Sequence, residues 1–87
     1  MNNLENWISK TKGLYLYPIS PGAAYEIHVT YWDKATDLLD SKCCLYLVGE
    51  WRTKDGRNTL ERECLLSDAP LKTCLEKAVE DNEENNN

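Results

Sequence analysis

The stretch that decides the fold runs from Lys42 to Leu66 and reads "KCCLYLVGEWRTKDGRNTLERECLL". Two runs rich in apolar residues flank Asp55 and Gly56. An Asp-Gly pair between two such runs is the strongest short-range signal for a β-hairpin with a two-residue turn. The sequence therefore predicts two long antiparallel strands that are joined at residues 55–56.

This turn also predicts which side chains of the two strands share a face of the sheet. If Lys54 lies opposite Arg57, one face carries four further pairs, namely Trp51 with Leu60, Gly49 with Arg62, Leu47 with Cys64 and Leu45 with Leu66. We expect this face to form the core, because it is apolar apart from Arg62, whose aliphatic stem can lie across Gly49. A bulged three-residue loop would mix apolar and charged residues on both faces, so it is disfavoured.

The residues before this hairpin predict one helix and two strands. Residues 2–13 show helical spacing of Leu4, Trp7 and Ile8 after a capping asparagine, with Gly13 as the stop. Residues 14–20 and 23–33 alternate as strands do. The alternation predicts the core-facing set Leu14, Leu16, Tyr25, Ile27, Val29 and Tyr31, and the opposite set Tyr15, Tyr17, Glu26, His28, Thr30 and Trp32.

The residues on either side of the hairpin complete an α+β fold. Asp33–Lys42 fits either a turn of helix that Asp33 caps or an ordered loop. After Ser67 or Asp68 as cap, a helical stripe follows at Leu71, Cys74, Leu75 and Ala78. We therefore expect residues 1–80 to form a single domain with a short N-terminal helix, about four mainly antiparallel strands and a C-terminal helix on one sheet face. The acidic, Asn-rich tail 81–87 is expected to be disordered.

Several classes of function are disfavoured by what the sequence lacks. It has no catalytic motif, and the single histidine, His28, has no partner that the sequence implies, so we expect no enzyme and no cofactor. The four cysteines form no CxxC pair, so we expect reduced thiols and no metal site. No run approaches the roughly 20 apolar residues of a membrane span. A cytoplasmic protein is the default expectation.

Two surfaces of the expected fold are candidates for binding a partner. One is the aromatic sheet face opposite the C-terminal helix, unless the N-terminal helix covers it, and the other is the charged hairpin. Tyr, Trp and Arg are enriched among the residues that dominate binding at interfaces. The residues expected to contact a partner are Tyr15, Tyr17, Trp32, Tyr46, Arg52, Lys54, Arg57 and Arg62.

The sequence thus favours a non-catalytic protein-binding module, and a homodimer through the aromatic face is compatible with it. Small acidic chains of this size include inhibitors and adaptors encoded by phages and mobile elements, anti-CRISPR proteins among them; that comparison rests on size and composition alone. The alternative is a nucleic-acid-binding protein that uses the basic residues between Arg52 and Arg62. Interleaved acidic residues make this hairpin nearly neutral, which disfavours phosphate binding.

Overall fold

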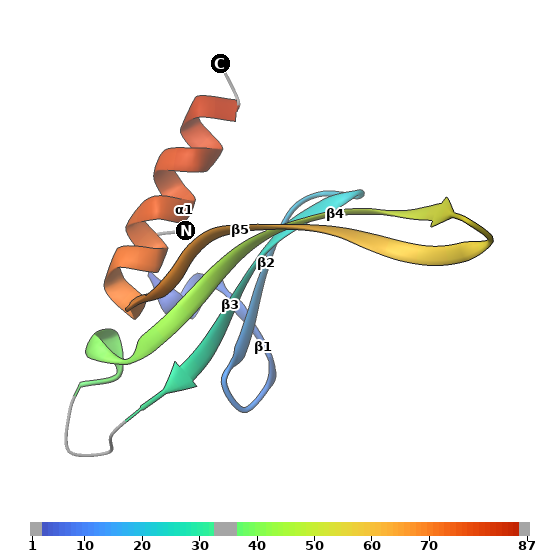
Figure 1. The fold of residues 1–87 in the computed structure, drawn as a ribbon. Coiled ribbons are helices and arrows are strands. Elements are labelled where there is room, and N and C mark those ends of the chain that lie inside the picture. The colour runs from blue at the N-terminus through green and yellow to red at the C-terminus, as the bar shows by residue number, and fades with distance from the viewer. Residues whose placement is uncertain (1–2, 33–36, 86–87) are drawn as a thin grey trace.

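The sheet and the helix that covers it are described by a computed structural model for residues 3–32 and 37–85, with the backbone alone at 50–54, 58–60 and 85. In this part of the chain, five antiparallel strands lie in the order β1-β2-β3-β4-β5, and α1 packs on one face (Figure 1). The expected α+β class is confirmed, with five strands instead of four. The elements are η1 (Leu4–Asn6), β1 (Ile8–Thr11), β2 (Leu14–Ser20), β3 (Ala23–Tyr31), η2 (Leu38–Asp40), β4 (Lys42–Lys54), β5 (Arg57–Pro70) and α1 (Leu71–Asn85).

The predicted N-terminal helix is wrong, because only a 3₁₀ turn forms. Asn3 caps this turn by accepting a hydrogen bond from the Glu5 amide, and the chain then enters β1, which pairs with β2. The helical spacing brings Trp7 into the core, where its ring lies 5.4 Å from that of Tyr17. Ile8 turns to the opposite face, beside Leu16. A helix this short is marginal in water. As strand β1, the same residues form hydrogen bonds with β2, which satisfies their backbone N–H and C=O groups.

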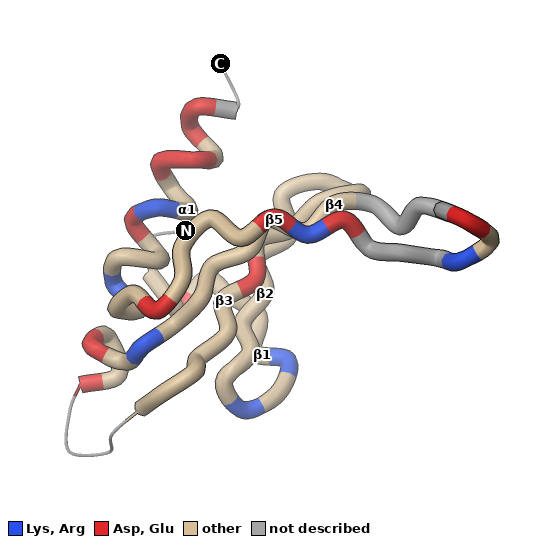
Figure 2. The backbone as a smooth tube through the Cα atoms, viewed as in Figure 1, with Lys and Arg blue, Asp and Glu red and all other residues tan. Residues whose placement is uncertain are grey.

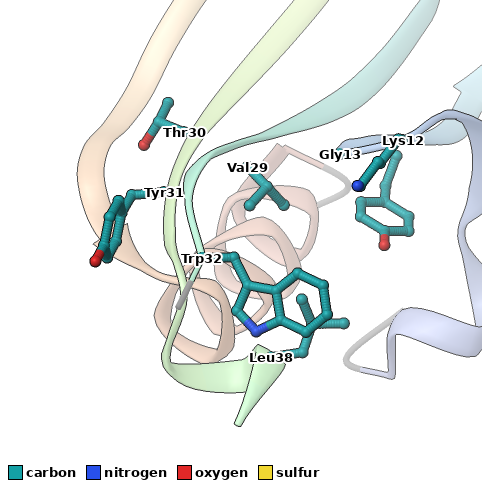
Figure 3. Close-up of a pocket in the computed structure, with 8 residues that line it drawn as sticks. Lys12, Gly13, Val29, Thr30, Tyr31, Trp32 and Leu38 are labelled. Atoms are coloured by element: carbon teal, nitrogen blue, oxygen red, sulfur yellow. The ribbon is translucent and has the colours of Figure 1, made fainter. Parts of the chain in front are cut away.

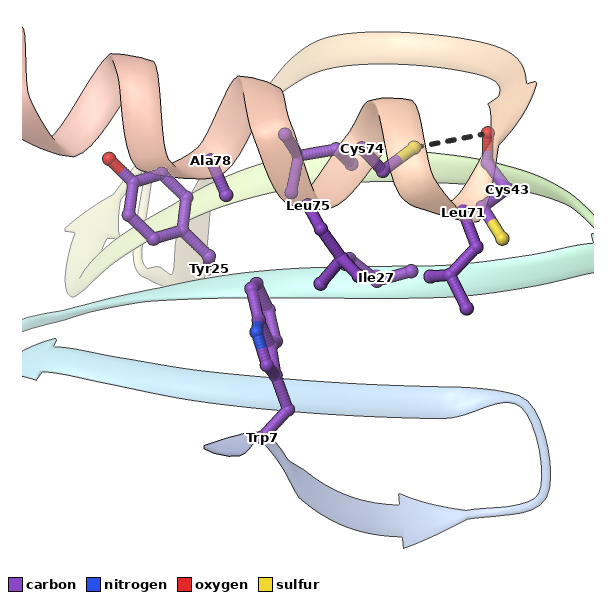
Figure 4. Close-up of a cluster of buried hydrophobic side chains, with 9 residues drawn as sticks. Trp7, Tyr25, Ile27, Cys43, Leu71, Cys74, Leu75 and Ala78 are labelled. Atoms are coloured by element: carbon purple, nitrogen blue, oxygen red, sulfur yellow. Dashed lines mark hydrogen bonds between the residues drawn. The ribbon is translucent and has the colours of Figure 1, made fainter. Parts of the chain in front are cut away.

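The core lies between the sheet and α1 (Figure 4). β3 and β4 contribute Tyr25, Ile27, Cys43 and Leu45, all fully buried. The predicted helical stripe is confirmed, because its four residues face these side chains and are buried as well: Leu71, Cys74, Leu75 and Ala78. Burying each large apolar side chain stabilises the folded chain by about 1.5–3 kcal/mol, so these contacts hold α1 on this face of the sheet.

Several of the predicted face assignments are wrong in β2 and β3. Tyr15 lies opposite Ile27, and Tyr17 lies opposite Tyr25. Directly opposed residues share a face, so both tyrosines pack against the core on the helix side. Leu14 and Leu16 therefore lie on the other face, which we call the open face because no described helix covers it. Tyr31, which was expected in the core, is 64% exposed, because the pairing shifts after Val29.

The β4–β5 hairpin follows the predicted register near its turn and departs from it nearer the body. Trp51 lies opposite Leu60 as predicted, but an extra residue in β4 then places Arg62 opposite Val48 and Cys64 opposite Tyr46. Glycine inside a strand often marks such a bulge, and Gly49 lies within this one. The predicted core positions of Arg62 and Cys64 are therefore wrong, and both residues lie on the open face. An extra residue in β5 then restores the predicted pair of Leu45 and Leu66.

The outer half of this hairpin projects from the body as a two-stranded arm (Figure 1). The pairing of β3 with β4 ends where Ala24 lies opposite Val48, so residues 49–63 pair only within the hairpin. We call residues 49–63 the arm. It makes the molecule elongated, with principal extents of 46 × 31 × 20 Å.

The helix begins later and ends later than the sequence predicts. β5 continues to Pro70, with Asp68 in the left-handed region at φ 55°, so neither Ser67 nor Asp68 caps α1. The helix then runs to Asn85, so the expected disorder of residues 81–87 is wrong for 81–85. Its last turns are held to the sheet, because the Tyr25 hydroxyl donates a 2.6 Å hydrogen bond to Asp81.

Two further expectations concern the rest of the described chain. Asp37 caps the 3₁₀ turn Leu38–Asp40, whereas the expected cap Asp33 lies outside the described residues. Among the described residues, no helix is both long enough and apolar enough to span a bilayer.

The bond between Tyr25 and Asp81 gives a stability prediction. Tyr25→Phe removes the donor and leaves the carboxylate without this partner, so we expect the free energy of unfolding to fall by about 1–2 kcal/mol in urea titrations. Tyr31→Phe changes an exposed tyrosine and should fall within about 0.5 kcal/mol of the parent chain. Equal values for the two variants would show that the bond contributes nothing.

Candidate partner-binding site

A cluster of four side chains lies near the middle of the open face; we call Glu26, His28, Tyr46 and Arg62 the open-face cluster. Glu26 is at its centre and is only 9% exposed. Its Oε1 lies 2.8 Å from His28 Nε2, and both carboxylate oxygens lie 3.5 Å from Arg62 Nη2. A carboxylate this buried needs such partners, because an unpaired buried charge is strongly unfavourable.

The ring of Tyr46 closes the open-face cluster. His28 meets this ring edge-on, with centroids 4.9 Å apart, and the Arg62 guanidinium carbon lies 5.5 Å from its centroid. Arg62 is thus held by a carboxylate and by an aromatic ring at once, while 45% of its side chain remains exposed. A guanidinium near an aromatic face gains about 0.5–1 kcal/mol when exposed.

The strand register brings these four residues together. Glu26 lies opposite Tyr46 across the β3–β4 pair and opposite Leu16 across the β2–β3 pair. Arg62 joins them only because of the extra residue in β4, which moves it opposite Val48. Apolar side chains adjoin the cluster on the same face, namely Ile8, Leu14, Leu16 and Val48.

Two of the thiols, Cys43 and Cys74, are buried, whereas Cys44 is half-buried and Cys64 is exposed. Cys44 and Cys64 adjoin Tyr46 on the open face. A hydrogen bond from the Asp68 backbone N–H lowers the pKa of Cys44, and the Ser67 and Tyr46 hydroxyls lower it further. Burial raises the pKa of Cys43, and it raises that of Cys74 to about 12. Among the described residues, no group of three or more His, Cys, Asp or Glu side chains is arranged to hold a metal ion.

The residues predicted to bind a partner separate into several places. Tyr46 and Arg62 meet in the open-face cluster. Arg57 is exposed beside the turn of the arm, whereas the side chains of Arg52 and Lys54 lie outside the described part. Tyr15 and Tyr17 face the core side, so the predicted aromatic face does not form as a unit.

Trp32 was expected on the open face, yet it lines a pocket at the end of the sheet with Tyr15, Val29 and Leu38 (Figure 3). Its displacement follows from the shift in pairing after Val29. The pocket encloses about 470 Å³, and Lys12 is its basic lining residue. Such a volume lies within the range of small-ligand pockets. Trp32 remains 44% exposed there.

Two residues of the open-face cluster were not expected to bind a partner. Glu26 and His28 alternate along one strand, and this spacing places them on the same face. That shared face was the signal that could have identified their contact. Their contact with Arg62 depends on the extra residue in β4, and no pattern in the sequence predicts its position.

Acidic and basic residues are interleaved along the described part of the arm, as Figure 2 shows. Four basic residues (Arg52, Lys54, Arg57 and Arg62) are balanced by four acidic residues (Glu50, Asp55, Glu61 and Glu63). The arm therefore carries no net charge.

Comparisons with models of protein families, with curated proteins and with solved structures found no match to this chain.

The two classes of thiol predict different reactivity. In a Cys64→Ser variant, iodoacetamide should modify Cys44 with a pH midpoint below that of an ordinary thiol, because the lowered pKa leaves more thiolate at a given pH. Cys43 and Cys74 should stay unmodified by peptide mass spectrometry until the chain is unfolded in urea, where all thiols react alike. Modification of folded Cys74 as fast as Cys44 would contradict the burial described above.

Proposed function

We propose that this chain is a non-catalytic protein-binding module of the inhibitor or adaptor kind, and that its partner docks on the open face. One observation carries the proposal: Arg62 is fixed between the Glu26 carboxylate and the Tyr46 ring while nearly half of its side chain remains exposed. The comparison with phage-encoded inhibitors stays a prediction.

The fixed arginine favours binding because little of its freedom remains to be lost. Immobilising a long side chain at an interface costs about 0.5–1.5 kcal/mol, and Arg62 is already positioned by two contacts. Arg and Tyr are also the residue types enriched at the centres of interfaces, where they are surrounded by apolar contacts. Ile8, Leu14 and Leu16 provide such surroundings on this face, and Ile8 is 47% exposed.

The arm adds a second contact region that continues directly from the open face. Arg62 belongs both to the arm and to the open-face cluster, so a partner seated on the cluster reaches the arm without a gap. The absence of net charge on the arm favours a protein partner with mixed charges. A protein that binds phosphates gains its affinity from a net basic surface and releases counterions on binding.

Affinity capture with matched variants tests this proposal. The tagged chain is exposed to an extract of its source organism, and retained proteins are identified by mass spectrometry. Arg62→Glu and Tyr46→Ala should each weaken retention of the main partner by roughly tenfold or more, as expected for central interface residues. Lys72→Glu, an exposed change on α1, should leave retention unchanged.

Two outcomes would overturn the proposal. If Trp32→Ala abolished retention while Arg62→Glu did not, the partner would bind at the pocket. If purified chain bound single- or double-stranded nucleic acid with an affinity that fell steeply between low and moderate salt, and Arg57→Glu abolished that binding, the alternative function would hold.

A further inference from the structure

The outer edge of β5 is the longest edge of the sheet without a neighbour in the described chain. β5 ends the strand order, and its partner β4 occupies only its inner edge. The outer edge is regular from Arg57 to Cys64. Beyond Cys64 the strand carries extra residues, and Asp68 has a positive φ, so its backbone bends out of line. The free regular edge therefore coincides with the arm.

The arm itself needs further support. A two-stranded hairpin is at best marginally stable in water, and the third strand, β3, stops at the base of the arm. Natural proteins rarely leave a long regular edge strand without a covering element, because its unpaired N–H and C=O groups attract other strands. A strand added along β5 would satisfy these groups.

We propose that a second copy of this chain supplies that strand, with the two β5 strands pairing antiparallel about a two-fold axis centred on Leu60. The available length limits where this axis can lie. The turn at residues 55–56 ends the usable edge on one side, and the irregularity after Cys64 ends it on the other. Leu60 and Glu61 lie at the middle of this edge, so a two-fold axis at either residue gives the longest overlap.

The charges favour the same register independently. It places Arg57 opposite Glu63 of the second copy, and the two-fold axis creates this pair twice. The ends of this segment carry opposite charges, as Figure 2 shows. A two-fold axis at Glu61 would instead place Glu61 opposite Glu61 of the second copy, and like charges that face each other are destabilising. That axis would also place Arg57 opposite Leu65, beyond the regular edge, and remove both charge pairs.

The geometry of the pair is compatible with both bodies. Each arm points away from its own body (Figure 1), so the two bodies lie at opposite ends of the joined arms. An axis through an antiparallel strand pair is perpendicular to the sheet, so both open faces point the same way. The inference does not rest on the proposed protein partner, but a dimer would present two open-face clusters on the same face of the joined sheet.

Sedimentation of charge variants tests the dimer and its register. The parent chain should sediment at about 100 μM with twice its mass of 10.0 kDa. Arg57→Glu creates Glu–Glu pairs and Glu63→Arg creates Arg–Arg pairs, so each variant alone should dissociate at concentrations roughly tenfold higher than the parent. An equimolar mixture of the two should dimerise again, because only the mixed pair has opposite charges at both positions. The doubly exchanged variant Arg57→Glu/Glu63→Arg should also dimerise.

These variants should fold, because neither residue has a favourable charge partner across its own hairpin. Arg57 lies opposite Lys54, and Glu63 lies opposite Leu47. Circular dichroism checks this, and Lys12→Glu, at the far end of the sheet, serves as a charge-matched control that should dimerise like the parent. A monomeric parent chain at about 100 μM would overturn the dimer. A mixture that remains monomeric, or one that is no more dimeric than its components, would overturn the register.

Discussion

The pairing of β4 with β5 is the interaction on which the rest of this structure depends. β4 pairs with β3 only along its first half, whereas it pairs with β5 from Lys42 to Lys54. The inner half of the hairpin therefore builds the core beneath α1, and the outer half becomes the arm. The single extra residue between Val48 and Trp51 decides on which face Arg62 emerges. Without it, Arg62 would point toward the helix side, and Glu26 would have His28 as its remaining partner in the open-face cluster.

The sequence predicts those elements whose signals are local. The Asp-Gly turn, the pairs that adjoin it and the helical stripe from Leu71 to Ala78 all follow from short-range spacing and are confirmed. The secondary structure of residues 8–11 does not follow from local signals, because a short helix and an edge strand are close in free energy. Pairing with β2 decides between the two. The end of α1 is not local either. Asp81 is ordered by a hydroxyl that lies 56 residues earlier in the chain.

The candidate site shows the same division. Tyr46 alternates with Leu45 and Leu47, which were expected in the core, and the structure places it on the open face. Tyr15, Tyr17 and Arg62 were assigned to the wrong faces, because a shift of one residue in register exchanges the two faces of a strand. The open face consequently holds a smaller and more polar surface than an aromatic stripe. The Glu26 carboxylate at its centre is largely removed from water, and its contacts with His28 and Arg62 offset the loss of hydration. The position of the Arg62 side chain is therefore set before a partner binds.

Backbone nuclear Overhauser effects across the hairpin test the central claim most directly. In isotopically labelled protein, the account predicts contacts of directly opposed residues between Val48 and Arg62 and between Tyr46 and Cys64. Contacts between Trp51 and Leu60 should appear as well, and they fix the extra residue to the segment between. Contacts between Gly49 and Arg62 together with Leu47 and Cys64 would contradict the account. Such contacts would show that β4 has no extra residue, that Arg62 points toward the helix side and that the open-face cluster does not form.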